Sequence, residues 1–276
     1  MNALFATHKP AGMSSSAFLT RLKRKYKFGK CGYSGTLDPF ASGLLLVGVG
    51  AYTRLFDYLD KSTKSYEATL WLGAKSESLD IEQIESVECV REFERGRVEE
   101  VLESFVGQVK YTPPRFSAKH INGKRAYELA REGVEFALKE CEMQVFEIKL
   151  LSYAHPFVSF RVKVSEGAYI RSLGELIAKK LGVNGAVSAL RRVSEGSVCV
   201  GREEIRELDP LSHIALPRVE LGELYQEFYD GKKITLKNQK LRVNTPYLVV
   251  FEEFFSIIEL NENGEVKYRL NRIPKC

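Results

Sequence analysis

One aspartate of this chain stands in a segment suited to presenting a reactive side chain. Asp38 lies in residues 32–43, which contain three glycines, and Pro39 follows it directly. Glycine lets a backbone adopt positive φ and approach a ligand closely, and proline fixes the backbone beyond the carboxylate. A rigid loop with one carboxylate suits a nucleophile or a general base. An aspartate before a proline is also a common turn former, and taken alone the residue types favour that simpler interpretation.

The segments on either side of this loop carry the periodic patterns of strands and helices. Ser14 is expected to cap a helix whose apolar face repeats at helical spacing through Tyr26. We expect residues 32–43 to form a loop, Leu44 to Val49 to form a buried strand and residues 52–59 to form a short amphipathic helix. Further strands are expected at residues 3–7, 65–72, 143–153, 158–164 and 187–193, and further helices at 98–106, 125–132 and 169–181.

Strands and helices alternate without a regular βαβ rhythm, which indicates an α+β fold with a mixed, largely antiparallel sheet. The composition changes after about residue 210, where short strand patterns follow one another at 240–243, 247–251, 255–260 and 266–270. Asn263-Gly264 supplies a hairpin turn between the last two. The sequence therefore predicts a large domain over residues 1–210 and a small β-rich module over 213–276.

The distribution of charge is more informative than the net charge of +5. Residues 77–103 hold ten acidic and three basic residues, a net charge of −7, so the rest of the chain carries +12. Five cations also fall within the seven residues from Arg21 to Lys27. A polyanion partner is plausible on this basis, although a solvated helix face explains the cations equally well.

Several function classes lack support in the sequence. The five cysteines are far apart and the four histidines are isolated, so we expect neither a disulfide framework nor a metal site. Gly48-x-Gly50 lacks a third glycine because position 53 is Thr53, which argues against a dinucleotide site. No apolar run approaches the roughly 20 residues that span a bilayer, and the first ten residues do not resemble a signal peptide. We therefore expect a cytoplasmic location and no membrane partner.

Six segments, in order along residues 3–200, resemble the TruB family of tRNA pseudouridine synthases. Residues 32–47 (GYSGTLDPFASGLLLV) resemble its catalytic motif, which contains the aspartate. The other five are residues 9–15 (KPAGMSS), 64–66 (KSY), 113–133 (PPRFSAKHINGKRAYELAREG), 167–173 (GAYIRSL) and 190–192 (LRR). The last segment resembles, more weakly, the family's compact PUA-like module. Several motifs in the family's order make this resemblance far more specific than a single motif would.

The resemblance implies an α+β pseudouridine-synthase domain and assigns the reactive groups. Asp38 would be the essential carboxylate, acting on C1′ or C6 of a uridine or as a base, and the sequence leaves these routes open. Arg171 would keep Asp38 ionised and oriented. Tyr66 would stack on the uracil and assist removal of the C5 proton, while Leu190 would pack under the base. This isomerisation needs no metal and no cofactor.

The resemblance also implies the substrate, the T-loop of tRNA at uridine 55. The insertion at about residues 111–140 would grip the RNA, which such enzymes recognise by shape and by splayed bases. We expect a monomer without an obligate protein partner. The family usually has a histidine where this chain has Tyr33, a ring that can stack but cannot shuttle protons near neutral pH. The expected substrate contacts come from Lys9, Tyr33, Lys119, Arg125, Tyr169 and Leu190.

Two other functions compete with this one. The first is a related synthase that modifies a different RNA, with or without a guide, and the full-length fit to the family's bacterial stand-alone pattern counts against it. The second is an RNA-binding module or folding chaperone that uses the scaffold without catalysis. An intact Asp38, Tyr66 and Arg171 argue against a loss of activity, although both functions could coexist in one protein.

Overall fold

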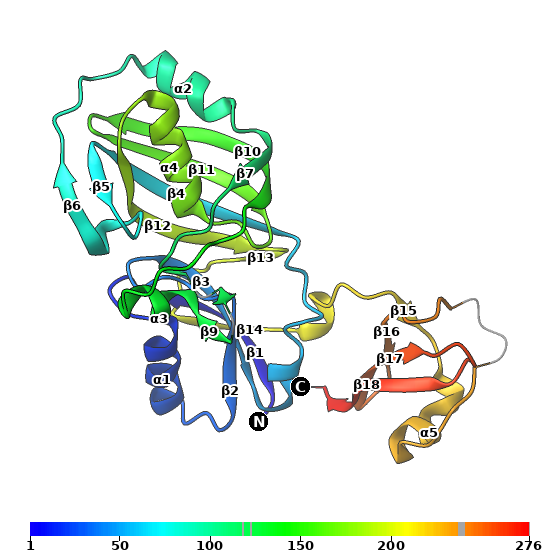
Figure 1. Cartoon of the computed structure of the whole chain (residues 1–276). Coiled ribbons are helices and arrows are strands. Elements are labelled where there is room, and N and C mark those ends of the chain that lie inside the picture. Colours follow the sequence, from blue (N-terminus) through cyan, green and yellow to red (C-terminus); the bar gives the residue numbers. More distant parts are fainter. Residues whose placement is uncertain (118, 122, 237–240, 276) are drawn as a thin grey trace.

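A computed structural model describes residues 1–275 except 118, 122 and 237–240, and its main feature is a sheet of ten strands (Figure 1). Eight strands follow one another in the order β14-β1-β3-β12-β4-β11-β10-β7, with β2 beside β3 and β13 beside β12. The sheet is mixed and largely antiparallel, which confirms the predicted α+β class. The strands are β1 (Ala3–Lys9), β2 (Cys31–Ser34), β3 (Ser42–Val49), β4 (Thr63–Leu72), β7 (Gly107–Tyr111), β10 (Cys141–Ala154), β11 (Phe157–Ser165), β12 (Gly185–Glu195), β13 (Val198–Cys199) and β14 (Ile205–Leu208).

The sheet has two halves. The first contains β14, β1, β3 and β2, and the second contains β12, β13, β4, β11, β10 and β7. They meet where β3 runs parallel to β12. Ser42 pairs there with Arg191, and Gly43 pairs with Arg192. Gly43 has a φ of +103°, and a Cβ at this position would lie 2.2 Å from the carbonyl oxygen of Arg192. Glycine is therefore required for the two backbones to approach this closely. Because the Asp38 loop immediately precedes β3, the loop lies at the junction of the halves.

Helices cover each half of the sheet separately (Figure 1). Helix α1 (Ser15–Lys25) packs Phe18 and Leu22 against the half that contains β1 and β3. Helices α2 (Arg95–Glu103) and α4 (Ile170–Leu181) cover one face of the other half. As predicted, Ser14 caps α1, and its hydroxyl accepts a hydrogen bond from the N–H of Ala17. Within the described residues, no helix is both long enough and apolar enough to cross a membrane.

Short elements connect the larger ones and lie around the junction. The acidic segment, residues 77–103, contains the 3₁₀ turn η2 (Ile81–Gln83) and β6 (Ile84–Val87), and β5 (Ala74–Ser76) directly precedes it. The predicted insertion contains β8 (His120–Ile121), β9 (Lys124–Arg125) and α3 (Ala126–Arg131). In Figure 1 this insertion lies beside the junction, between α1 and the second half of the sheet.

Two sequence predictions near the loop were wrong. Residues 32–34 were expected in the loop but extend the sheet as β2, because Tyr33 and Ser34 pair with Val47 and Leu46 of β3. Residues 52–59 were expected to form an amphipathic helix, but only the 3₁₀ turn η1 (Gly50–Arg54) forms there. A second turn follows, in which the N–H of Tyr58 donates to the carbonyl oxygen of Leu55, and Leu59 then pairs with Ile214 in a β-bridge. Tertiary pairing thus outweighs a local helical pattern.

A second sheet of four strands occupies the C-terminal part. Its order is β15 (Arg218–Val219), β16 (Tyr247–Val250), β17 (Phe254–Leu260) and β18 (Val266–Pro274), with α5 (Tyr225–Asp230) and the 3₁₀ turns η3 (Pro210–Ser212) and η4 (Gly222–Leu224) nearby. The last three predicted strands and the turn at Asn263-Gly264 are confirmed. Of the strand expected at residues 240–243, Lys240 lies outside the described residues, and residues 241–243 form no strand. This small sheet is consistent with a PUA-like module.

The C-terminal sheet shares a hydrophobic cluster with the first half of the large sheet. Phe255 is fully buried in this cluster together with Leu4 and Leu44. Tyr52 packs its ring 6.2 Å from that of Phe255 and donates a hydrogen bond to the carbonyl oxygen of Pro274 at 2.9 Å. The small sheet is therefore part of a continuous core.

Phe255→Ala should lower the free energy of unfolding of the whole chain by about 3–5 kcal/mol, because it opens a cavity in the shared cluster. Urea denaturation followed by circular dichroism measures the change. Phe146→Ala is the matched control, since Phe146 is 47% exposed and its truncation should change stability by no more than about 0.5 kcal/mol. Two separate transitions, with only one shifted by Phe255→Ala, would contradict a shared core.

Candidate active site

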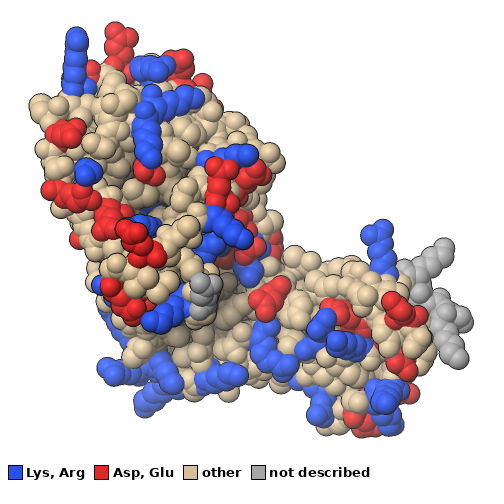
Figure 2. All heavy atoms as spheres, viewed as in Figure 1, with Lys and Arg blue, Asp and Glu red and all other residues tan. Residues whose placement is uncertain are grey.

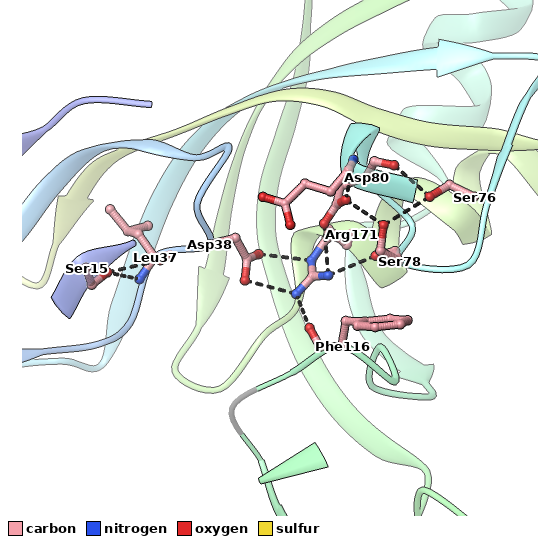
Figure 3. A network of polar contacts seen from close by, with 9 residues as sticks. Ser15, Leu37, Asp38, Ser76, Ser78, Asp80, Phe116 and Arg171 are labelled. Carbon is pink, nitrogen blue, oxygen red and sulfur yellow. Dashed lines mark hydrogen bonds and ion pairs between the residues drawn. The ribbon is translucent and has the colours of Figure 1, made fainter. Parts of the chain in front are cut away.

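Two buried side chains, Lys9 at the end of β1 and Ser15 at the start of α1, hold the backbone of the Asp38 loop. The hydroxyl of Ser15 donates to the carbonyl oxygen of Leu37 at 3.0 Å and accepts from the N–H of Leu37 at 2.9 Å (Figure 3). The ammonium of Lys9 donates to the carbonyl oxygens of Pro10 and Met13, with a longer contact of 3.4 Å to that of Pro39. The residues just before and just after Asp38 are thus both fixed.

The carboxylate of Asp38 forms a bidentate ion pair with Arg171, which lies in the first turn of α4. Nε of Arg171 lies 2.9 Å from Oδ2 of Asp38, and Nη2 lies 3.0 Å from Oδ1. The Arg171 side chain is 3% exposed and that of Asp38 is 32% exposed. Parallel contacts of this kind fix the orientation of both groups. The ion pair therefore presents a carboxylate of defined orientation at the surface.

Arg171 is held by further oxygens that come from distant parts of the chain (Figure 3). Nη1 donates to Oδ2 of Asp80 at 3.0 Å and to the carbonyl oxygen of Ser78 at 2.8 Å. Nη2 also donates to the carbonyl oxygen of Phe116 at 2.8 Å. Each of the five N–H donors of a guanidinium is therefore matched by an oxygen within 3.0 Å.

Asp80 is a site residue to which the sequence analysis gave no role. Its carboxylate is buried, and Oδ1 accepts hydrogen bonds from the hydroxyl of Ser78 at 2.6 Å and from the N–H of Glu82 at 2.9 Å. The hydroxyl of Ser76 binds the carbonyl oxygen of Asp80 at 2.6 Å. The available signal was the alternation of two serines and an aspartate at positions 76, 78 and 80.

Burial and charge act in opposite directions on the pKa values of the site. Desolvation raises the pKa of Asp38 above its ordinary value, and the nearby charge of Asp80 raises it further, whereas Arg171 and Lys9 lower it. Burial lowers the pKa of Lys9 to about 8, against the attraction of Asp38 and Glu82. The charge of Arg171 therefore makes the rise in the pKa of Asp38 smaller than burial alone would make it.

Two hollows open on either side of Asp38 and share it with Thr36, Leu37 and Arg171. The first has a volume of about 470 Å³ and the second about 280 Å³. The first is also lined by Ser14, Ser15, Ser16, Tyr33, Pro39, Asp80, Glu82, Phe116, Ser117, Arg125, Tyr127 and Arg131. The second is also lined by Gly35, Lys64, Tyr66, Lys119, Gly167, Ala168, Tyr169, Ile170, Leu190 and Arg192. A flat ligand in either hollow would meet the same carboxylate.

The second hollow brings together most of the predicted base-binding residues. Tyr66 lies on β4 and Leu190 lies opposite Ala68 on the neighbouring strand β12. Tyr169 precedes α4, and its ring lies 6.2 Å from that of Tyr111. Burial raises the pKa of the Tyr66 phenol, although Arg192 lowers it, so the phenol stays protonated at neutral pH. The hollow combines two aromatic rings and apolar surface with four cations, Lys64, Lys119, Arg171 and Arg192. Aromatic and apolar surface beside an oriented carboxylate suits a planar base.

The remaining predicted contact residues occupy different places. Tyr33 and Arg125 line the first hollow, and the Tyr33 hydroxyl lies 3.0 Å from that of Ser16. Lys119 lines the second hollow and donates to Sγ of Cys141 at 3.0 Å. Within the described part of the chain, Lys9 is not among the side chains that line either hollow. Its ammonium contacts main-chain oxygens beneath the loop.

The side chains around the two hollows offer acid–base and nucleophilic chemistry. Across residues 1–275, apart from 118, 122 and 237–240, no three His, Cys, Asp or Glu side chains are grouped as ligands for a metal ion. What the site presents is one partly exposed carboxylate held by a guanidinium, with aromatic and apolar surface beside it. This arrangement suits attack on, or proton removal from, a planar substrate.

Comparisons with known proteins match the chain to one family over most of its length. Residues 23–170 match the model of the TruB family pseudouridylate synthase (N terminal domain). A protein of Helicobacter hepaticus named tRNA pseudouridine synthase B is 56% identical over 272 residues, which cover 98% of this chain and 95% of the relative. Its namesake in Sulfurovum sp. is 51% identical, covering 100% of this chain and 98% of the relative.

Solved structures share the fold at much lower identity. The chain superposes on the crystal structure of a Cbf5-Nop10-Gar1 complex with a TM-score of 0.67 and 20% identity, covering 99% of this chain and 84% of that chain. An archaeal box H/ACA sRNP Nop10-Cbf5 complex gives a TM-score of 0.67 and 19% identity, covering 99% and 86%. These likenesses concern the fold alone.

Ser15→Ala should loosen the Asp38 loop, because it leaves the buried N–H and carbonyl of Leu37 without the hydroxyl that binds both. We expect a loss of about 1–3 kcal/mol in the free energy of unfolding and faster amide hydrogen exchange at Leu37. Ser14→Ala is the control, since it removes only the cap of α1, at about 1 kcal/mol, and should speed exchange at Ala17. Unchanged exchange at Leu37 in Ser15→Ala would show that the hydroxyl does not hold the loop.

Proposed function

Because the chain belongs to the TruB family of pseudouridylate synthases, we propose that it converts a uridine of tRNA to pseudouridine, at position 55 in the T-loop. The relatives' name supports a tRNA substrate. The observation that carries the proposal is the bidentate ion pair between Asp38 and Arg171, which lies between two hollows. This pair supplies the oriented carboxylate that the isomerisation requires.

The reaction moves one bond of the uridine without oxidation or reduction. The C1′–N1 bond breaks, the uracil rotates and C1′ bonds to C5. The proton of C5 leaves and N1 takes up a proton, so the composition of the uridine is unchanged. Asp38 acts as an ionised carboxylate, either as a nucleophile at C1′ or C6 or as a base at the ribose. Its exposed edge faces both hollows, and the substrate can therefore approach it.

Arg171 keeps the carboxylate of Asp38 ionised and fixes its orientation. Its own orientation is fixed by Asp80 and by the carbonyl oxygens of Ser78 and Phe116, so the guanidinium cannot follow a moving carboxylate. An oriented group of this kind needs little reorganisation during the reaction. Asp80 therefore positions Asp38 through Arg171.

The second hollow binds the uracil ring. Tyr66 stacks on the base and Leu190 packs beneath it, while Tyr169 and Lys119 line the same hollow. The raised pKa of Tyr66 keeps its phenol protonated, so the phenol stacks and donates a hydrogen bond rather than acting as a ready phenolate. A flipped nucleotide requires on the order of a few kcal/mol to leave its stack, and burial of the base in this hollow offsets part of that.

The rest of the tRNA contacts the first hollow and the basic surface. Tyr33 and Arg125 line the first hollow, where a ring and a guanidinium suit RNA stacking and phosphate binding. Figure 2 shows Lys and Arg side chains gathered along the lower edge, where Figure 1 places α1 and β2, and acidic side chains over β5 and β6. Glu204 neutralises part of the α1 charge by pairing with Arg21 and Lys25. We therefore expect the RNA phosphates to bind along α1 and β2 and to avoid the acidic surface over β5 and β6.

We assign the catalytic domain to residues 1–210, the RNA-gripping insertion to about 111–140 and the PUA-like RNA-binding module to 213–276. The insertion is linked to the catalytic group, because the carbonyl of Phe116 binds Arg171. We propose that Lys9 serves the substrate indirectly, through the backbone that it holds. The chain would act as a monomer, in the cytoplasm and without an obligate protein partner or cofactor.

Asp38→Asn should abolish pseudouridine formation while leaving tRNA binding intact, because it removes the ionisable carboxylate but keeps its shape. Tritium release from tRNA labelled with 5-³H-uridine measures the reaction, and filter binding measures affinity. Asp57→Asn is the matched control, since Asp57 is exposed and should retain the full rate. Tritium release by Asp38→Asn at the wild-type rate would exclude Asp38 as the essential group. No release by the wild type, with tRNA bound, would favour the binding-protein alternative.

The rate should fall on the acid side as pH drops through the raised pKa of Asp38, because only the ionised form reacts. Arg171→Met removes the cation that lowers this pKa, so the acid side of the pH–rate profile should move to higher pH. Single-turnover rates measured against pH test this. Arg161→Met removes an exposed arginine on β11 and should leave the pH dependence of the rate unchanged. If the acid side of the pH–rate profile is the same in Arg171→Met as in the wild type, Arg171 does not keep Asp38 ionised.

A further inference from the structure

A second buried arginine lies at the junction of the two half-sheets. The side chain of Arg192 on β12 is 2% exposed. Nε donates to the carbonyl oxygen of Leu44 at 2.8 Å, and Nη2 donates to that of Gly35, also at 2.8 Å. These two carbonyls bracket residues 36–43, the segment that contains Asp38. One guanidinium therefore holds both ends of the loop.

The turn at Gly35 is shaped around this guanidinium. Gly35 has a φ of +66°, and a Cβ there would lie 3.0 Å from Nη1 of Arg192. The backbone therefore passes directly against the charged group, with no side chain between them. A displacement of Arg192 would move the turn that leads into Asp38.

Glu195 supplies the counter-charge for this arginine. Its side chain is fully buried, with Oε2 lying 3.8 Å from Nη1 of Arg192 and Oε1 lying 3.6 Å from Nζ of Lys64. Among the described residues, neither oxygen accepts a hydrogen bond. Side chains three apart on a strand normally point to opposite faces. A β-bulge between Arg192 and Ser194 shifts the register, which accounts for their lying on the same side.

We propose that Arg192 is a positioning residue for Asp38, and that Glu195 acts through Arg192 by compensating its charge. Attraction within a buried ion pair is largely offset by desolvation, so the pair is a poor source of stability. A planar guanidinium can bind two carbonyls at once, which an ammonium cannot do in the same way. The inference rests on the proposed function of Asp38, since it concerns the placement of that carboxylate.

The decisive experiment compares single-turnover tritium release by wild type and Arg192→Lys at saturating 5-³H-uridine tRNA. The lysine keeps the charge but not the two hydrogen bonds, so the rate should fall by about 100-fold, the effect of a misplacement of about 1 Å. The Kd for tRNA, from filter binding, should stay within about twofold of wild type. Amide hydrogen exchange should quicken over residues 35–44 and stay unchanged in β10 and β11.

Two further variants separate positioning from a general loss of stability. Thr7→Val removes a buried hydroxyl that donates to the carbonyl oxygen of Leu45 at 2.6 Å, a bond between β1 and β3 that involves none of residues 35–44. It should lower stability without changing the rate. Glu195→Gln keeps the hydrogen bonds of Arg192 and should slow the reaction by about tenfold, that is, by about 1.4 kcal/mol in the barrier. If Glu195 acts through Arg192, the double variant should be no slower than Arg192→Lys alone.

Each outcome decides a different point. An unchanged rate in Arg192→Lys would overturn the proposal, and so would equal losses of rate and affinity, which would mark Arg192 as a group that binds RNA in the second hollow. If Arg192→Lys does not fold, an unchanged rate in Glu195→Gln would overturn the proposal, and a slower rate with unchanged affinity would support it. No release by the wild type would refute the proposed function itself.

Discussion

The structure around the site depends on the burial of one guanidinium, that of Arg171. A buried cation is tolerated only when oxygens surround it, and here they come from Asp38, Ser78, Asp80 and Phe116. These residues belong to three segments that are far apart in the sequence, and α4, which carries Arg171, is a fourth. Satisfying the five N–H groups of Arg171 therefore requires the loop, the acidic segment, the insertion and α4 to converge. The position of Asp38 follows from that convergence.

The junction of the half-sheets explains why a substrate can reach this group. Strands β3 and β12 pair at only two positions, and the loop that precedes β3 sits where the two halves separate. Hollows open on either side of it because side chains do not fill the space beside the junction. The loop itself needs support there, which Lys9, Ser15 and Arg192 provide through hydrogen bonds to its main chain. Access and rigidity thus arise from the same arrangement.

The C-terminal sheet packs directly against the large sheet and is not joined to it by a linker alone. Its apolar side chains Leu248, Phe255 and Ile257 share a cluster with Leu4 and Leu44 of the large sheet. Shared burial of this kind gives the small sheet a fixed place beside β1 and η1. An RNA held by both parts would therefore meet two surfaces with a set spacing. That geometry favours recognition of a folded RNA by shape.

The sequence by itself determined the α+β class, most strand and helix positions and the identity of Asp38, Tyr66 and Arg171 as candidates. These are properties that local periodicity and short motifs carry. Only the tertiary structure showed that Asp80 holds Arg171, that Lys9 supports backbone rather than lining a hollow, and that a bulge lets Arg192 and Glu195 share a face. It also replaced the expected helix at residues 52–59 with a turn and a β-bridge. The physical reason is that buried charge and strand register are set by partners distant in sequence, and local patterns contain no information about those partners.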